Sequence, residues 1–216
     1  MQLILNAMQG LVLMVAIGAF SAAAAKEPYY GGIGVGYAKA RLGNNPLGIT
    51  GATATSLSRD ESDIGAKLFA GYRLHPNWAV EGGYVDLGKT SAKRTMTAPG
   101  IGSISIDSRN SGWFVDVVGR VPVGNGVSLI GKVGQIYAEN RKQLSTSGAV
   151  SLAPGTASSF REREFNWKYG AGAEYEISKT MAARGEFELY RKLGKEDPGG
   201  ENEAGLFSLN LLVKFE

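Results

Sequence analysis

The sequence predicts an all-β protein, an eight-stranded antiparallel up-and-down barrel that crosses a membrane, and three observations carry this prediction. The segment from Gly205 to Phe215 alternates between large apolar residues and smaller or polar ones, which indicates a strand with one apolar face. Similar segments recur along the chain, joined alternately by short turns and long polar stretches. The chain also opens with an apolar stretch typical of an export signal. A tilted strand of about ten residues is long enough to cross a bilayer.

The amino-terminal stretch from Leu11 to Phe20 is apolar but too short to span a membrane as a helix. Ala23 and Ala25 fit a signal-peptide cleavage site, although no Lys or Arg precedes Lys26. We therefore expect residues 1–25 to be a signal peptide and residues 26–216 to form one β-barrel domain. A buried helix of a soluble domain is the alternative interpretation of this stretch.

Four alternating segments occupy the first half of the exported chain. Tyr29 to Leu42 sets aromatic and branched residues against glycines and alanines, and Asp63 to Leu74 sets Ile, Leu and Tyr against Lys, Phe and Arg. Trp78 to Leu87 places Trp, Val and Tyr opposite a glutamate. Gly112 to Val123 places Trp and Val opposite an aspartate and an arginine. Each pattern has a period of two, which predicts a strand.

The second half repeats the pattern four times. Val127 to Ala138 sets Leu, Val and Tyr opposite a lysine, and Phe165 to Ile177 alternates seven apolar residues with glycines and charged residues. Met181 to Leu193 places Ala, Phe and Leu opposite Arg and Glu, and Gly205 to Phe215 closes the series. The total of eight strands puts both termini on the same side, as single-chain bacterial barrels require.

The connections alternate in length. Short turns are predicted at 75–77, 124–126 and 178–180, and long polar loops at 43–62, 88–111, 139–164 and 194–201. Asn125 and Gly126 both tolerate positive φ, which predicts a tight hairpin between two strands. Short turns that alternate with long loops are typical of outer-membrane barrels.

Alternation alone leaves open whether the apolar face points to lipid or to the core of a secreted barrel. The placement of aromatic residues near strand ends favours lipid, because membrane barrels carry aromatic residues at both interfaces. The aromatic residues expected at the membrane interface are Tyr29, Trp78, Trp113, Tyr137, Phe165, Trp167 and Phe215.

The opposite face carries charges of both signs, and in a narrow lumen an unpaired charge is unfavourable. We expect Glu174 to pair with Arg184, and Asp116 to pair with Lys132. The residues of the expected lumen ion-pair network are Lys67, Glu81, Asp116, Arg120, Lys132, Glu174, Arg184 and Glu186. A plug that fixes strand register and a gate for ions or small solutes are both open interpretations.

Composition and motifs exclude several classes. The 216 residues contain 23 Lys and Arg, 20 Asp and Glu and no Cys, so disulfides and thiol chemistry are excluded. A formal net charge of +3 gives no support for a nucleic-acid partner. The glycines of 31–36 fall inside a predicted strand with no helix after them, so they do not indicate a phosphate loop. We expect no metal and no cofactor.

Five segments resemble strands of the small OmpA-like transmembrane barrels of Gram-negative bacteria. The hairpin of Gly170–Ile177 and Met181–Phe187 resembles the sixth and seventh strands of that family, with an inward Glu followed by an inward Arg. The segments Phe69–Leu74, Trp78–Gly88 and Gly205–Phe215 resemble further strands of it. The resemblance implies an outer-membrane location without the peptidoglycan-binding domain of the long members, and assembly through the carboxyl-terminal strand, although Glu216 follows the usual terminal Phe.

The expected role is structural or surface-interacting and non-enzymatic, with lipid, lipopolysaccharide, the barrel-assembly machinery and an extracellular loop ligand as partners. A narrow pore and a lipid-modifying enzyme are the alternatives. The sole histidine, His75, lies in a predicted turn at the end away from the long loops, which disfavours a Ser-His-acid hydrolase near the outer leaflet.

Overall fold

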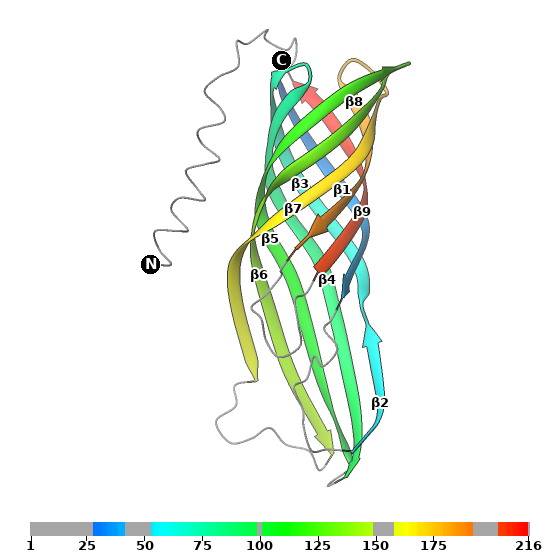
Figure 1. Cartoon of the computed structure of the whole chain (residues 1–216), viewed down its shortest axis with the longest axis vertical. Coiled ribbons are helices and arrows are strands. Elements are labelled where there is room, and N and C mark those ends of the chain that lie inside the picture. The colour runs from blue at the N-terminus through cyan, green and yellow to red at the C-terminus, as the bar shows by residue number, and fades with distance from the viewer. Residues whose placement is uncertain (1–27, 42–52, 99–100, 149–157, 192–202, 216) are drawn as a thin grey trace.

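The computed structural model describes residues 28–41, 53–98, 101–148, 158–191 and 203–215. They form one antiparallel sheet of nine strands that closes into a barrel (Figure 1). The strands are β1 (Tyr29–Arg41), β2 (Thr53–Asp60), β3 (Ser62–His75), β4 (Trp78–Ala98), β5 (Gly102–Gly124), β6 (Val127–Gly148), β7 (Ser159–Glu176), β8 (Met181–Tyr190) and β9 (Glu203–Phe215). The predicted signal peptide and the predicted loop at 194–201 lie outside the described residues. No helix in these described ranges has the length and apolar character needed to cross a bilayer.

The sheet closes because the first strand pairs with the last. β1 pairs with β3 on one side and with β9 on the other, and the remaining neighbours follow chain order through β4 to β8. β2 and β3 are separated only at Glu61, and both pair with β4. The nine strands therefore occupy eight positions around the ring, and the predicted eight-stranded antiparallel barrel is confirmed.

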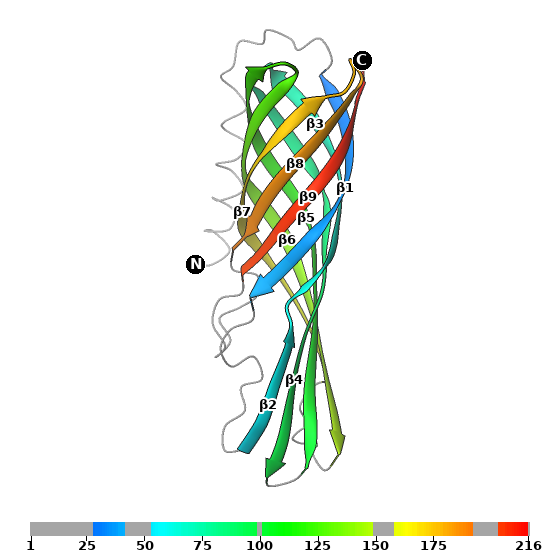
Figure 2. The ribbon, with the colours of Figure 1, turned by 90° about the vertical axis from the view of Figure 1, so that its right-hand side faces the viewer.

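Three turns and one sheet extension define the two ends of the molecule. At the turn between β5 and β6, Asn125 and Gly126 have φ values of 51° and 75°, which confirms the predicted hairpin. At the other end β2, β4, β5, β6 and β7 continue well beyond β1, β8 and β9, as Figure 2 shows. Among the described residues, this extension lies on one side of the barrel.

The long polar loops predicted at 43–62, 88–111 and 139–164 were largely wrong. β2 lies in the first, the ends of β4 and β5 fill most of the second, and the end of β6 and start of β7 lie in the third. These segments are rich in Ser, Thr, Lys and Arg, and the side chains buried on the inner face of the extension are small or polar, such as Thr90, Ala92 and Ser108. Their hydrophobic alternation is weak although their backbone pairing is continuous.

The barrel is apolar outside and mixed inside. Large apolar side chains such as Ile33, Leu68 and Leu209 are 60–64% exposed on the outer surface. The interior combines buried aromatic and aliphatic residues with buried charges. Small residues on β1 make room for this filling, since a Cβ at Gly32 would lie 2.4 Å from the Phe69 ring. An outward apolar face and a packed lumen are what a small membrane barrel requires.

A glycine bulge marks the point where β4 leaves the barrel and enters the extension. The pairing of β4 with β5 shifts between Asp86 and Lys89, and Gly88 between them has φ 76°. The Asp86 carboxylate accepts a hydrogen bond from the Gly88 amide at 2.9 Å, and the Asp63 carboxylate accepts one from the Lys89 amide at 2.8 Å. Such bulges turn a strand and need a residue that tolerates positive φ.

We expect Gly88→Ala to lower the free energy of unfolding by about 1–2 kcal/mol, because alanine is strained at positive φ and its Cβ would lie 2.6 Å from Asp63 Oδ2. Urea unfolding in lipid vesicles measures this. Gly131→Ala is the matched control, since a Cβ there meets no described atom within 4 Å. Equal stability of the two variants would show that the bulge is not strained by a side chain.

Candidate functional site

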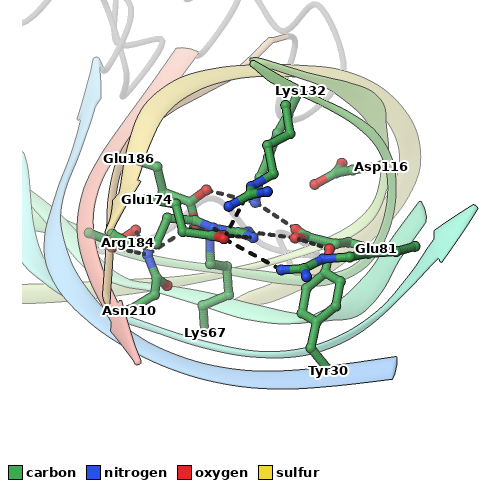
Figure 3. A network of polar contacts seen from close by, with 12 residues as sticks. Tyr30, Lys67, Glu81, Asp116, Lys132, Glu174, Arg184, Glu186 and Asn210 are labelled. Atoms are coloured by element: carbon green, nitrogen blue, oxygen red, sulfur yellow. Dashed lines mark hydrogen bonds and ion pairs between the residues drawn. The ribbon is translucent and has the colours of Figure 1, made fainter. Parts of the chain in front are cut away.

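The lumen holds a continuous series of ion pairs in which the sign of the charge alternates at every step. Figure 3 shows its central part, around Arg184 and Glu81. Six cations and six carboxylates take part, and each contact joins a cation to a carboxylate. In order from the turn end, the series is Lys214, Glu176, Arg120, Glu174, Arg184, Glu81, Lys132, Glu186, Lys67, Glu188, Lys168 and Asp116. The name lumen network is used below for these twelve residues.

Arg184 and Glu81 form the centre of the lumen network. Arg184 donates to Glu174 Oε2 through Nη2 at 2.6 Å and to Glu81 Oε1 through Nη1 at 2.5 Å. The Tyr30 hydroxyl donates to the same Glu81 oxygen at 2.7 Å, and Lys132 donates to Glu81 Oε2 at 2.6 Å. Glu81 and Glu174 are fully buried, so these bonds replace the water that each carboxylate gives up.

Five charges from β3, β5, β7 and β8 continue the lumen network toward the extension. Lys67 contacts Glu186 and donates to Glu188 Oε2 at 2.9 Å. Lys168 donates to Glu188 Oε1 at 2.8 Å and to Asp116 Oδ2 at 2.7 Å. The Lys168 ammonium also lies 3.8 Å from the centre of the Phe114 ring, a cation–π contact within a fully buried site.

The turn end of the lumen network is partly open to water. Arg120 contacts Glu174 at 3.4 Å and Glu176 at 3.0 Å, and Lys214 contacts Glu176 at 2.8 Å. The Glu176 side chain is 38% exposed, whereas that of Glu174 is completely buried. A hollow between Arg73, Arg120 and the turn has a volume of about 10 Å³, close to the space of one water.

All eight residues expected in the lumen ion-pair network face inward and take part in it. Glu174 and Arg184 contact each other as expected, but the expected pair of Asp116 with Lys132 was wrong. Asp116 lies opposite Gly134 on β6, and Gly134 lies opposite Lys168 on β7. The glycine has no side chain between them, so Asp116 reaches across β6 to Lys168, while Lys132 contacts Glu81 and Glu186 instead.

Several members of the lumen network were not among the expected site residues. They share the inward phase of the same strands, so the alternation that placed Glu174 and Arg184 also carries the signal for them. The residues that sequence reasoning missed are Lys168, Glu176, Glu188 and Lys214, together with Tyr30, Arg73 and Asn210 at its edges.

The seven aromatic residues expected at the membrane interface all point outward and are 39–66% exposed. Tyr29, Trp78 and Phe215 lie near the turn end. Trp113, Tyr137 and Phe165 stand side by side across β5, β6 and β7 toward the extension, with Trp167 two residues after Phe165. On β9, Phe207 and Phe215 are eight residues apart, about 27 Å along the strand, or roughly 20 Å after a tilt of about 40°.

The remaining candidates carry little chemistry. His75 ends β3 beside the first turn, and its Nδ1 accepts a hydrogen bond from the Asn77 amide at 3.3 Å. Within the described residues, no group of three or more His, Asp or Glu side chains is arranged to hold a metal ion.

Comparison with known proteins agrees with this architecture. Neisserial surface protein A is 12% identical, with a TM-score of 0.52 over 87% of this chain and 97% of that one. Ail of Yersinia pestis is 17% identical, with a TM-score of 0.48 over 87% of this chain and 99% of Ail. OprG of Pseudomonas aeruginosa is 13% identical, with a TM-score of 0.49 over 88% of this chain and 97% of OprG. No curated protein sequence matches. The family model of the outer membrane protein beta-barrel domain matches residues 10–215. The chain therefore belongs to this family of barrels and is located in the Gram-negative outer membrane.

Proposed function

We propose that the protein is a structural, non-enzymatic component of the outer membrane: a sealed barrel that presents a one-sided sheet outside the cell. The observation that carries this proposal is the lumen network, whose central charges are completely or almost completely buried. Short turns of outer-membrane barrels face the periplasm, so the extension of β2 and β4 to β7 faces outward.

The packing of the lumen supports a sealed barrel. Opening a path past Glu81, Arg184 and Lys132 would separate charges whose side chains are buried, and each broken contact leaves an uncompensated charge. The Phe69 ring adds to the obstruction, because its centre lies about 5–6 Å from the charged ends of Lys67, Lys132 and Arg184.

We expect the purified protein to give no stable single-channel conductance in planar lipid bilayers at moderate voltage. The matched variant is Arg184→Gln, which removes the charge that joins Glu174 to Glu81. A conductance that is present in the native protein would contradict the sealed barrel. A conductance that appears only in Arg184→Gln would identify the lumen network as the seal.

A gated pore is the second candidate, and one feature of the lumen network favours it. Lys67, Lys132 and Lys168 each contact two carboxylates, so a lysine that leaves one partner keeps the other. Pairs that can be exchanged in this way allow a lumen to rearrange without stranding a charge. Voltage-dependent openings in the native protein would favour this candidate over the sealed barrel.

The position of His75 supports a non-enzymatic role. Lipid hydrolysis by a Ser-His-acid arrangement needs the histidine beside the nucleophile at the outer leaflet. The sole histidine of the chain ends β3 at the periplasmic turns, the opposite end of the barrel. Outer-membrane lipid and lipopolysaccharide are the partners that this location supports. We propose that the barrel-assembly machinery recognises the alternating β9 strand.

A further inference from the structure

Four cations stand in one row across the outer surface of the extension. Lys89 on β4 lies opposite Arg109 on β5, Arg109 lies opposite Arg141 on β6, and Arg141 lies opposite Arg161 on β7. Neighbouring strands are about 4.8 Å apart, so the row is roughly 14 Å long. The three arginines are 53–61% exposed, and all four residues border a surface hollow of about 530 Å³. These four residues are called the cation row.

Like charges directly opposite one another destabilise a sheet. The cation row contains three such contacts in succession, so it is an unfavourable arrangement for a sheet in water alone. Two carboxylates compensate part of it. Asp86 accepts from Arg109 Nη2 at 2.5 Å. Glu139 contacts Arg141 at 2.5 Å, Arg163 at 2.8 Å and Arg161 at 3.4 Å.

The compensation around Glu139 is incomplete. One carboxylate is shared by three guanidinium groups, which leaves an excess of two positive charges at this point of the surface. The hydrogen bonds from Arg141 and Arg163 lower the pKa of Glu139, so its carboxylate stays ionised and holds the arginines in place. Two further carboxylates lie nearby and keep their charge: Asp107, which accepts a hydrogen bond from Ser91 and borders the hollow, and Asp63, which accepts from two backbone amides.

The height of the cation row above the membrane is set by the aromatic residues on the same strands. An outward row of aromatic residues crosses β4 to β7 and consists of Tyr84, Trp113, Tyr137 and Phe165. The ring centres are 5.2 Å apart in the first pair and 4.8 Å apart in the last. Arg109 is four residues beyond Trp113 on β5, which is roughly 10 Å farther from the membrane centre for a strand tilted by about 40°. Charges at this height meet the polar headgroups of the outer leaflet.

We propose that the cation row binds the phosphate groups of lipopolysaccharide, the phosphorylated glycolipid of the outer leaflet, beside the barrel. Guanidinium groups bind phosphate oxygens through paired hydrogen bonds, and three of the four side chains are arginines. A bound phosphate adds negative charge where Arg141, Arg161 and Arg163 share the single carboxylate of Glu139. The proposal concerns the outer surface and does not depend on whether the lumen is sealed.

The test is a titration of the folded protein in detergent micelles with purified lipid A, the phosphorylated lipid part of lipopolysaccharide, followed by native mass spectrometry. The variant Arg109→Gln/Arg141→Gln/Arg161→Gln should bind about ten- to a hundred-fold more weakly, because several charge-assisted hydrogen bonds are lost. The control variant Lys39→Gln/Arg59→Gln/Arg191→Gln removes the same charge from positions outside the cation row and should bind within about threefold of the native protein.

Two further titrations keep the proposal falsifiable if the triple variant fails to fold. Dephosphorylated lipid A should bind the native protein as weakly as phosphorylated lipid A binds the triple variant. Equal binding of both forms would overturn the proposal, as would equal losses in the triple and control variants. Inorganic pyrophosphate should bind far more weakly than lipid A. If it binds as tightly, the cation row is a site for soluble anions and not for the membrane lipid.

Discussion

Lys168→Met should lower the free energy of unfolding by about 3–5 kcal/mol, the cost of breaking a buried ion pair by removing one partner. The Lys168 ammonium is fully buried between Asp116 and Glu188. Among the described residues it is the only ion-pair partner of Asp116, whereas Glu188 keeps Lys67. Urea unfolding of the protein in lipid vesicles, followed by tryptophan fluorescence, measures the change.

A double variant and a control make this result specific. Lys168→Met with Asp116→Asn should recover part of the loss, because the stranded carboxylate is then neutral, and a double-mutant cycle gives the coupling energy. Lys214→Met makes the same change at the turn end, where the partner Glu176 is 38% exposed, and should lose about 1 kcal/mol or less. Additive effects of Lys168→Met and Asp116→Asn would show that the two residues are not energetically coupled.

Leu209→Arg should destabilise the barrel in lipid by about 2–4 kcal/mol, the penalty for a charge on the lipid face near the bilayer midplane. Leu209 is 64% exposed on β9, between Val35 of β1 and Gly185 of β8. It lies two residues from Phe207 and six from Phe215, so it is inside the part of the outer surface that these two aromatic residues delimit and that we expect to face lipid.

The control for this experiment is Ile101→Arg at the tip of the extension between β4 and β5. Ile101 is 76% exposed, so it is at least as accessible as Leu209, but it lies in water beyond the headgroups. Its replacement should change the free energy of unfolding by less than about 0.5 kcal/mol. Equal effects of the two substitutions would mean that the outer surface at Leu209 does not face lipid.

The directions of the lumen charges could be predicted from the sequence, and their partners could not. Alternation fixes the side of the sheet on which Lys132 lies, because successive residues of a strand point to opposite faces. Its partners, however, are Glu81 on β4 and Glu186 on β8, and neither strand is hydrogen-bonded to β6. Contacts across a lumen depend on the tilt and closure of the barrel, which no single strand encodes.

The strands of the extension, in contrast to the inward direction of the lumen charges, could not be predicted from the sequence. They could not be found from apolar alternation, because that pattern needs one face of the strand in apolar surroundings and the other in polar ones. The cation row could not be predicted from the sequence either. Arg109, Arg141 and Arg161 are far apart in the chain, and only the register of β5, β6 and β7 aligns them.

The strand that closes the ring has a consequence for how the barrel can be opened. The inward residues of β1 are Tyr30, three glycines and alanines, and those of β9 are mostly Leu, Ser and Asn, so the described part of this seam contains only one member of the lumen network, Lys214. Parting β1 from β9 would break the backbone hydrogen bonds between these strands. It would also separate ion pairs that cross the lumen, those of Lys67 on β3 with Glu186 and Glu188 on β8 and that of Glu81 on β4 with Arg184 on β8. The seam between the two ends of the chain is therefore held by more than its own hydrogen bonds, because charges on the strands at either side of it bind one another through the lumen.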